Sequence, residues 1–93
     1  MIKSLRDKET ENIFNRQFSG KFSQNIQHVV RKKLITLDAA TVLNDLRIPP
    51  GNRVEALKGD RKGQHSIRIN DQWRICFNWK AGDAYDVEIT DYH

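Results

Sequence analysis

Apolar positions near the start of the chain recur at the spacing of a helix. Ile13, Phe14 and Phe18 fall on one side of a helical projection. Asp7 precedes them as a candidate N-cap, and Gly20 stands just past the last turn, where glycine commonly ends a helix. The pattern therefore predicts a helix between Asp7 and Gly20.

A second and longer apolar stripe follows directly. It repeats every 3.6 residues or so and consists of Phe22, Ile26, Val29, Val30, Leu34 and Leu37. Ser23 is its candidate N-cap. Arg31, Lys32 and Lys33 flank the stripe, so the predicted helix is amphipathic with a basic outer surface. A solvated charged face is one interpretation of that surface.

The stretch 48–52 contains both prolines and divides the chain into two unlike halves. A short helical turn from Asp38 or Thr41 to Leu46 fits the sequence before it, and Pro49 and Pro50 forbid its continuation. Downstream, turn-forming sequences at hairpin spacing separate four predicted strands. These strands are residues 53–57, 64–69, 72–79 and 84–90.

Apolar and polar side chains alternate along the last two predicted strands. The apolar set is Trp73, Ile75, Phe77 and Trp79 in one strand and Tyr85, Val87 and Ile89 in the next. A period of two gives each strand one apolar and one polar face. An antiparallel sheet of consecutive hairpins, with both helices on its apolar face, satisfies the helical and the strand patterns together. We therefore predict one α+β domain over residues 1–93.

Composition agrees with a globular domain and excludes several other classes. Hydrophobic residues make up 38% of the chain and charged residues 30%, and no apolar run approaches the ~20 residues of a membrane span. The first residues, 1–6, lack the apolar core of a secretory signal, so we expect a cytoplasmic protein without membrane contact. Cys76 is the one cysteine, which excludes an internal disulfide, and we interpret it as a half-buried strand residue.

Positive charge directs attention to the polar face of the predicted sheet. Sixteen lysines and arginines against twelve acidic residues give a net charge of +4. The basic residues expected on or beside that face are Lys58, Arg61, Lys62, Arg68 and Arg74. Such a cluster is typical of binding to a phosphate backbone. The alternative is structural, since Arg68 also has Asp86 or Glu88 available as a cross-strand partner.

The last three residues, Asp91, Tyr92 and His93, bring a carboxylate, a phenol and an imidazole together at the end of the final strand. A frayed tail is the simpler interpretation. If the sheet holds this end beside Arg74, His93 is suited to proton transfer near neutral pH. We expect His28 and His65 to have no such role and no metal to be bound, because the histidines lack ligand spacing.

Several segments, taken in order, closely resemble one family of bacterial toxins. They are residues 1–4, 37–41, 57–61, 73–75, 82–85 and 91–93. Together they resemble the HigB toxins, or plasmid maintenance system killer proteins, of the RelE-like superfamily. Segments 49–53 and 64–68 are most similar to the chromosomal GraT-type members. The resemblance covers essentially the whole chain and implies the RelE-like fold.

The resemblance implies the toxin of a type II toxin-antitoxin system. Such a toxin is expected to enter the A site of the 70S ribosome, on the 30S subunit, and to cut mRNA there without a metal ion or other cofactor. It also implies a HigA-type helix-turn-helix antitoxin that neutralises the toxin and brings the pair to operator DNA. The active-site pattern of the family falls on Lys58, Arg74, Asp91, Tyr92 and His93, and Arg61, Lys62 and Arg68 remain expected RNA contacts.

The chain departs from the family pattern in two places. Glu55 and Ala56 stand where many members have His-Pro, which removes one candidate proton-transfer histidine and places more of the catalysis on the C-terminal cluster. Gln64 and His65 replace a common aromatic pair. Two other functions stay open: a non-catalytic module that binds RNA or the ribosome, and a degenerate toxin that acts as co-repressor with its antitoxin. The basic surface at 31–33 fits either ribosomal RNA or an acidic face of the antitoxin.

Overall fold

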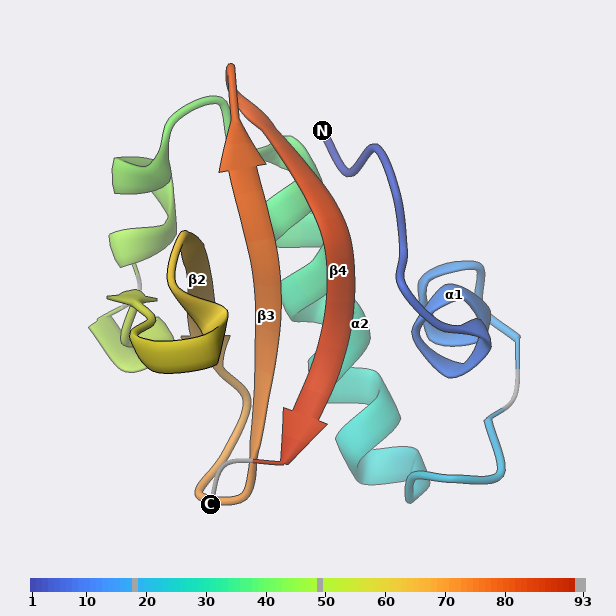
Figure 1. The fold of residues 1–93 in the computed structure, drawn as a ribbon. Helices are drawn as coiled ribbons and strands as arrows, with labels where there is room; N and C mark the ends of the chain where they lie inside the picture. The colour runs from blue at the N-terminus through green and yellow to red at the C-terminus, as the bar shows by residue number, and fades with distance from the viewer. Residues whose placement is uncertain (18, 49, 92–93) are drawn as a thin grey trace.

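A computed structural model describes residues 1–17, 19–48 and 50–91. The two α-helices come first in the chain and an antiparallel meander of strands follows, as predicted for an α+β domain (Figure 1). The helices are α1 (Lys8–Phe14), α2 (Gln24–Ala39) and the short 3-10 turns η1 (Leu43–Arg47), η2 (Pro50–Asn52) and η3 (Gly59–Arg61). The strands are β1 (Glu55–Ala56), β2 (Gln64–Arg68), β3 (Trp73–Lys80) and β4 (Asp83–Asp91).

Both predicted N-caps are confirmed. The Asp7 carboxylate accepts a hydrogen bond from the Thr10 amide at 2.8 Å, and the Ser23 hydroxyl accepts one from the Ile26 amide at 3.3 Å. These bonds satisfy amide groups that the first turn of a helix leaves without intrahelical partners. Each helix therefore begins where its sequence indicates.

The predicted end of the first helix at Gly20 was wrong. α1 ends at Phe14, because Arg16 takes a left-handed backbone conformation with φ of 63° that turns the chain away from the helix axis. Phe18, which was expected to extend the apolar face of this helix, lies outside the described residues.

The four strands pair antiparallel in the order β1-β2-β3-β4, as the hairpin spacing predicted. Helix α2 crosses one face of it, while α1 lies against α2 and beside β4 (Figure 1). The buried core between α2 and the sheet includes Val30, Leu34, Leu37, Ile67, Ile75, Phe77 and Val87. Neither α1 nor α2 covers the opposite face in Figure 1, and we call it the open face.

The prediction that Tyr85 lies on the apolar face was wrong, because β4 contains a bulge. The pairing with β3 shifts between Cys76 and Asn78, and Asp86 has a φ of 52°. Tyr85 is consequently paired with Asn78, while Val87 remains buried. One extra residue in a strand reverses the alternation on one side of the bulge. Tyr85 therefore shares the open face instead of the apolar one.

The N-terminal segment extends the sheet beyond β4. Ile2 and Leu5 form isolated parallel bridges with Ala84 and Val87. The amides of Lys3 and Arg6 donate to carbonyl groups of β4 at 2.8 and 2.9 Å. This segment leads into α1, so β4 is flanked on its outer side by backbone and its edge is covered.

Two features are absent from the described ranges. Among the helices there, none has both the length and the apolar character needed to cross a bilayer. In the same ranges, no three His, Cys, Asp or Glu side chains lie close enough together to hold a metal ion.

Candidate active-site cleft

A cavity of about 520 Å³ lies on the open face, and we call it the open-face cleft. Its lining comes from the N-terminal segment, from η3 and from the central strands: Arg6, Asp60, Arg61, Lys62, Gln64 and Asn78. Three of these six side chains are cationic and one is acidic. The cleft therefore presents a positively charged surface of the kind that accepts phosphate groups.

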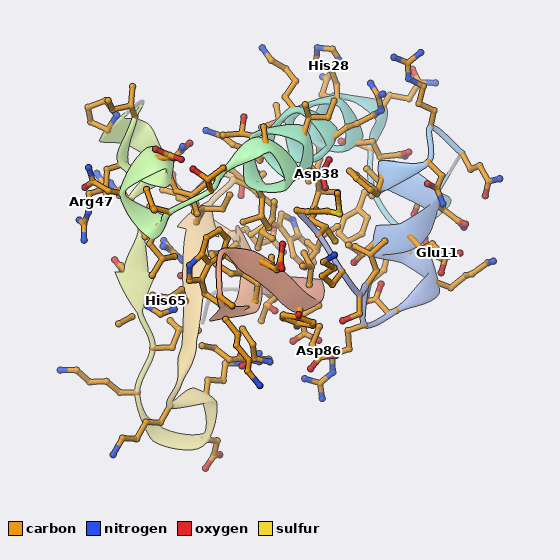
Figure 2. The ribbon with its side chains drawn as sticks, turned by 90° about the horizontal axis from the view of Figure 1, so that it is seen from above. Glu11, His28, Asp38, Arg47, His65 and Asp86 are labelled. Carbon is orange, nitrogen blue, oxygen red and sulfur yellow. The ribbon has the colours of Figure 1, made fainter. Side chains whose placement is uncertain are left out.

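The loop 58–63 forms one wall of the cleft. It projects away from the sheet at the lower left of Figure 2, in pale yellow. Gly59 and Gly63 have φ values of +66° and +96°, which side-chain-bearing residues rarely adopt, so the glycines allow the tight reversal between β1 and β2. The loop begins at Lys58, an exposed residue whose carbonyl accepts from the Arg61 amide.

Glu88 lies at the centre of the charge arrangement on the open face. Its carboxylate contacts the Arg61 guanidinium at 2.8 Å and the Arg6 guanidinium at 3.2 Å. The Thr90 hydroxyl donates to the same carboxylate at 3.3 Å. One acidic side chain on β4 thus holds two arginines that come from opposite sides of the cleft.

Arg74 shares this face by register, opposite Arg68 and Thr90, yet only 4% of it is exposed. Its Nε donates to the Ser66 hydroxyl at 2.7 Å and its Nη2 donates to the Arg53 carbonyl at 2.6 Å. The Glu55 carboxylate lies 3.8 Å from the same guanidinium. Alternation correctly gave the face of Arg74 but not its burial there.

Arg68 is not among the residues that line the cleft. Its guanidinium is ion-paired with Asp71 in the turn before β3, and neither of the cross-strand partners considered for it, Asp86 and Glu88, is the one it contacts. Burial lowers the pKa of Lys33 on α2, and the charges of Lys32 and Arg68 lower it further. The charge of Arg68 thus acts on the helical layer, whereas Arg61 and Lys62 line the cleft.

The C-terminal cluster lies only partly within the described residues. Asp91 ends β4 opposite Trp73 and accepts a hydrogen bond from the Gln72 side chain at 3.3 Å. Its neighbour Thr90 is opposite Arg74, so the end of β4 does lie beside that arginine. Tyr92 and His93 lie outside the described residues.

His65 packs against the core, as expected. Its ring stacks on Phe77 with centroids 6.2 Å apart and an angle of 25° between the planes. Its Nδ1 is buried and has no hydrogen-bond partner in the described part of the chain. The half-buried ring belongs to the apolar face, so this histidine does not enter the cleft.

Sequence patterns missed Arg6 and Asn78 as residues that line the cleft, and Tyr85 as a residue of the open face. Strand alternation already placed Asn78 on the polar face, but the pattern did not show that it lines a cleft. The bulge in β4 reverses the alternation at Tyr85, so the sequence pattern assigned this residue to the apolar face. Arg6 gave no local signal, because it reaches the cleft through the pairing of the N-terminal segment with β4.

Comparison with known proteins identifies the family. Residues 3–93 match the family model of HigB-like toxins, described as the RelE-like toxin of the type II toxin-antitoxin system HigB. The chain belongs to the HigB-like toxin family. A toxin of a type II system implies an antitoxin partner, and this HigB-like chain is therefore one half of a toxin-antitoxin pair.

Relatives of this HigB-like toxin extend over most or all of its length. Toxin HigB-1 of Vibrio cholerae serotype O1 is 52% identical over 68 residues, which cover 73% of this chain and 72% of that protein. Endoribonuclease HigB of Proteus vulgaris is 35% identical over 94 residues and the full length of both chains.

A solved structure supports the RelE-like fold. The crystal structure of a mutant of YafQ from E. coli matches 98% of this HigB-like chain and 91% of its own, with a TM-score of 0.60 and 15% sequence identity. At that identity the likeness concerns the fold alone, and it agrees with two helices on a four-stranded antiparallel sheet.

Proposed function

We propose that this HigB-like toxin is a ribosome-dependent endoribonuclease that cuts mRNA in the A site and thereby stops translation. The observation that carries the proposal is the open-face cleft, whose cationic walls come from Arg6, Arg61 and Lys62. The full-length similarity to a protein named Endoribonuclease HigB supports the same chemistry. We place the protein in the cytoplasm, where its substrate is.

The proposed reaction needs no metal ion, because RNA carries its own nucleophile. The 2′-hydroxyl oxygen attacks the adjacent phosphorus and the bond to the 5′-oxygen breaks, leaving a 2′,3′-cyclic phosphate and a free 5′-hydroxyl. A base must take the 2′-hydroxyl proton, an acid must give one to the leaving oxygen, and cations must stabilise the phosphorane charge.

The roles of the basic residues are proposed from where the fold places them. Arg61 and Lys62 bind the RNA backbone, because they line the cleft. Lys58 stabilises the phosphorane charge from the start of the same loop. Arg74 is held by Ser66 and by the Arg53 carbonyl and acts from beneath the substrate as a fixed positive charge. Arg68, paired with Asp71, contributes to RNA attraction at longer range.

Proton transfer is assigned to the C-terminal cluster. We propose that His93 or Asp91 serves the 2′-hydroxyl and that Tyr92 stacks on a base, a contact worth ~1–3 kcal/mol. Asp91 supports this assignment by its place at the end of β4, one residue after the partner of Arg74. The substitution of His-Pro by Glu55 and Ala56 leaves these C-terminal groups with the main acid-base work.

We also propose that the antitoxin is of the HigA helix-turn-helix type. In that arrangement the antitoxin neutralises the toxin and binds operator DNA, and the toxin reaches the operator only through it. The basis for this part is family membership.

The deciding experiment is primer extension on a defined mRNA in a purified translation system. The intact protein is compared with a chain ending at Tyr92, each with and without ribosomes. We expect cuts at ribosome-occupied codons, and a loss of about 10²–10⁴-fold without His93 if it is the general acid or base. A loss below threefold would contradict the assignment of His93.

Two other outcomes would replace the proposed function. Stalled translation without cut mRNA would show a non-catalytic RNA- or ribosome-binding module. No effect on translation at all would show a degenerate toxin that acts as co-repressor.

A further inference from the structure

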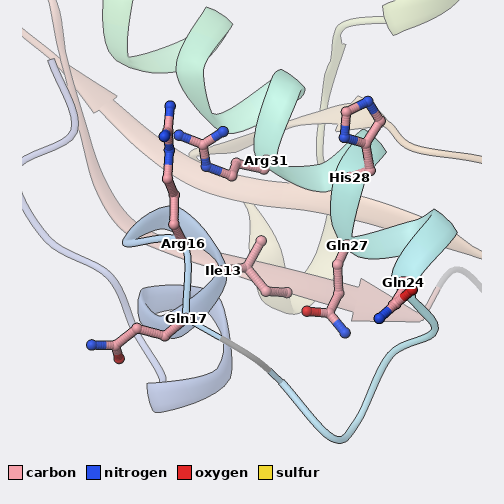
Figure 3. Close-up of a pocket in the computed structure, with 7 residues that line it drawn as sticks. All are labelled: Ile13, Arg16, Gln17, Gln24, Gln27, His28 and Arg31. Carbon is pink, nitrogen blue, oxygen red and sulfur yellow. The ribbon is translucent and has the colours of Figure 1, made fainter.

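A second cationic cavity, of about 350 Å³, lies between α1 and α2 (Figure 3). We call it the interhelical groove, and its lining is Ile13, Arg16, Gln17, Gln24, Gln27, His28 and Arg31. None of these lining residues is acidic, and the polar ones all carry nitrogen donors. The groove belongs to the helical layer, whereas the open-face cleft lies on the other face of the sheet.

Arg16 and Arg31 both line the groove, and Figure 3 shows their guanidinium groups directed to the same side of it. Within the described ranges, neither guanidinium has a hydrogen bond or an ion pair, and the Nε of Arg31 is fully buried without a partner. By contrast, Arg6 and Arg61 on the open face share a carboxylate. Two like charges that line one groove without a counter-charge repel each other, and a buried donor without an acceptor is costly.

The backbone at Arg16 adds a second cost to this arrangement. Its φ of 63° lies in the left-handed region, which is sparsely populated by residues other than glycine, asparagine and aspartate. The turn is fixed by hydrogen bonds from the Arg16 amide to Ile13 and from the Gln17 amide to Asn12, at 3.2 and 2.7 Å. Strained residues of this kind often lie at binding sites. A bound anion would offset the charge repulsion.

The groove is also preformed. Gln27 is held by hydrogen bonds from its side-chain nitrogen to the carbonyls of Ser19 and Phe22, at 2.7 and 2.6 Å. Its side-chain oxygen accepts from the Ser19 amide at 3.2 Å. Ile13, which is 2% exposed, belongs to the same lining. The hydrogen bonds occupy the donors of Gln27 and fix this wall of the groove, so a ligand would meet a preformed shape.

Positive charge continues from the groove along α2. His28 also lines a neighbouring cavity of about 480 Å³ together with Lys32 and Lys33. The cationic surface is thus longer than one carboxylate requires and suits a chain of phosphates. A phosphate also presents enough acceptor oxygens to bridge two guanidinium groups, which bind it as forks.

We propose that the interhelical groove binds phosphodiester groups of structured ribosomal RNA, with Arg16 and Arg31 sharing one phosphate. The inference rests on the proposed ribosome dependence and adds to it a second RNA contact, on the face away from the mRNA. In this arrangement the cleft handles the cut strand while the groove holds the toxin on the ribosome.

The test uses purified 70S ribosomes programmed with a defined mRNA. We would compare the wild type with Arg16→Asn/Arg31→Gln, in which asparagine tolerates the left-handed backbone and glutamine keeps the helix. The matched control, Arg47→Gln/Lys80→Gln, removes the same charge elsewhere; both are exposed, and Arg47 lies far from α1 in Figure 2. Circular dichroism would establish that each variant folds.

We expect Arg16→Asn/Arg31→Gln to raise the half-saturating ribosome concentration at least tenfold and to reduce the salt dependence of binding by about 2 in log–log slope. The cleavage rate at saturating ribosomes should not change. Arg16→Lys/Arg31→Lys should recover part of the affinity, because lysine keeps the charge but not the fork. The control should shift half-saturation by less than threefold.

Three results would overturn the inference: half-saturation like that of the wild type, an equal shift in the control, or a fall in the saturating rate alone. Half-saturation like that of the wild type would instead favour an acidic protein, such as the antitoxin, as the ligand of the groove. If the wild type cuts no mRNA, the proposed function fails, and co-sedimentation of the same variants with 70S ribosomes then tests the groove separately.

Discussion

At the scale of single residues, the buried guanidinium of Arg74 supports the fold as well as the open face. Substitution Arg74→Ala would leave the Ser66 hydroxyl and the Arg53 carbonyl without this donor. We expect the free energy of unfolding to fall by about 2–4 kcal/mol, because each buried polar group loses its partner. Urea denaturation measures this, and a loss below about 0.5 kcal/mol would contradict it.

Glu88 determines how much of the positive charge on the open face is available to RNA. Substitution Glu88→Gln would release Arg6 and Arg61 from their shared carboxylate. We expect a short single-stranded RNA to bind about three- to tenfold more tightly at low salt, with a steeper salt dependence. Fluorescence anisotropy of a labelled oligonucleotide measures both quantities.

The matched control for Glu88 is Asp86→Asn on the same strand. Asp86 is exposed and accepts from Asn78 at 3.3 Å, whereas Arg6 and Arg61 pair with Glu88, and asparagine tolerates the positive φ of position 86. Equal affinity gains in the two variants would mean that only net charge matters. Weaker binding by Glu88→Gln would mean that the carboxylate positions the arginines for RNA.

At the scale of elements, η1 depends on one ionised carboxylate. Asp45 accepts hydrogen bonds from the amides of Thr41 and Val42 at 3.0 and 3.3 Å, and these bonds lower its pKa. Its contribution to stability is therefore present above its ordinary value of about 4 and is lost as the pH falls through the lower, folded-state pKa.

Substitution Asp45→Asn removes this pH dependence. We expect the wild type to be the more stable protein at pH 7. Its advantage should shrink as the pH falls below about 4, the ordinary pKa of the carboxyl group in the unfolded chain, towards the lower pKa of the folded protein. Thermal unfolding of both proteins between pH 3 and pH 7 measures the difference. A gap that stays constant across that range would exclude a role for the ionised form.

Elements whose signals are local were predictable from sequence, and those set by pairing were not. Ser23 and the apolar stripe behind it indicate α2 within a single stretch, and turn residues indicate the hairpins. The bulge beside Asp86 depends on how β4 meets β3, so alternation alone placed Tyr85 on the wrong face. The early end of α1 depends likewise on the backbone of Arg16.

The candidate site divides in the same way. The location of Arg61 and Lys62 beside the polar face was predictable, because both lie in one short turn between two strands. The buried Arg74 guanidinium donates to the carbonyl of Arg53, which lies 21 residues earlier in the chain. Arg6 reaches the cleft through its ion pair with Glu88, near the other end of the chain. Contacts at such separations leave no pattern in a single sequence.

At the scale of the whole molecule, the first six residues are part of the sheet. The Lys3 and Arg6 amides donate to β4, and the Ile2 amide donates to Asp38 on α2 at 2.8 Å. We expect the Lys3 and Arg6 amides to exchange with deuterium nearly as slowly as those within β4. Amide exchange followed by NMR measures this, and exchange at the rate of an unstructured peptide would show that Arg6 is not held at the cleft.

Cys76 lies on the central strand β3 and is 3% exposed, more deeply buried than the half-buried position predicted for it, with its sulfur free of any disulfide. A thiol so enclosed is shielded from oxidants and alkylating reagents while the protein stays folded. It becomes reactive only when the sheet opens around it. Because the chain holds one cysteine, the rate of its labelling reports that opening directly, and the protein carries a natural reporter of its own stability.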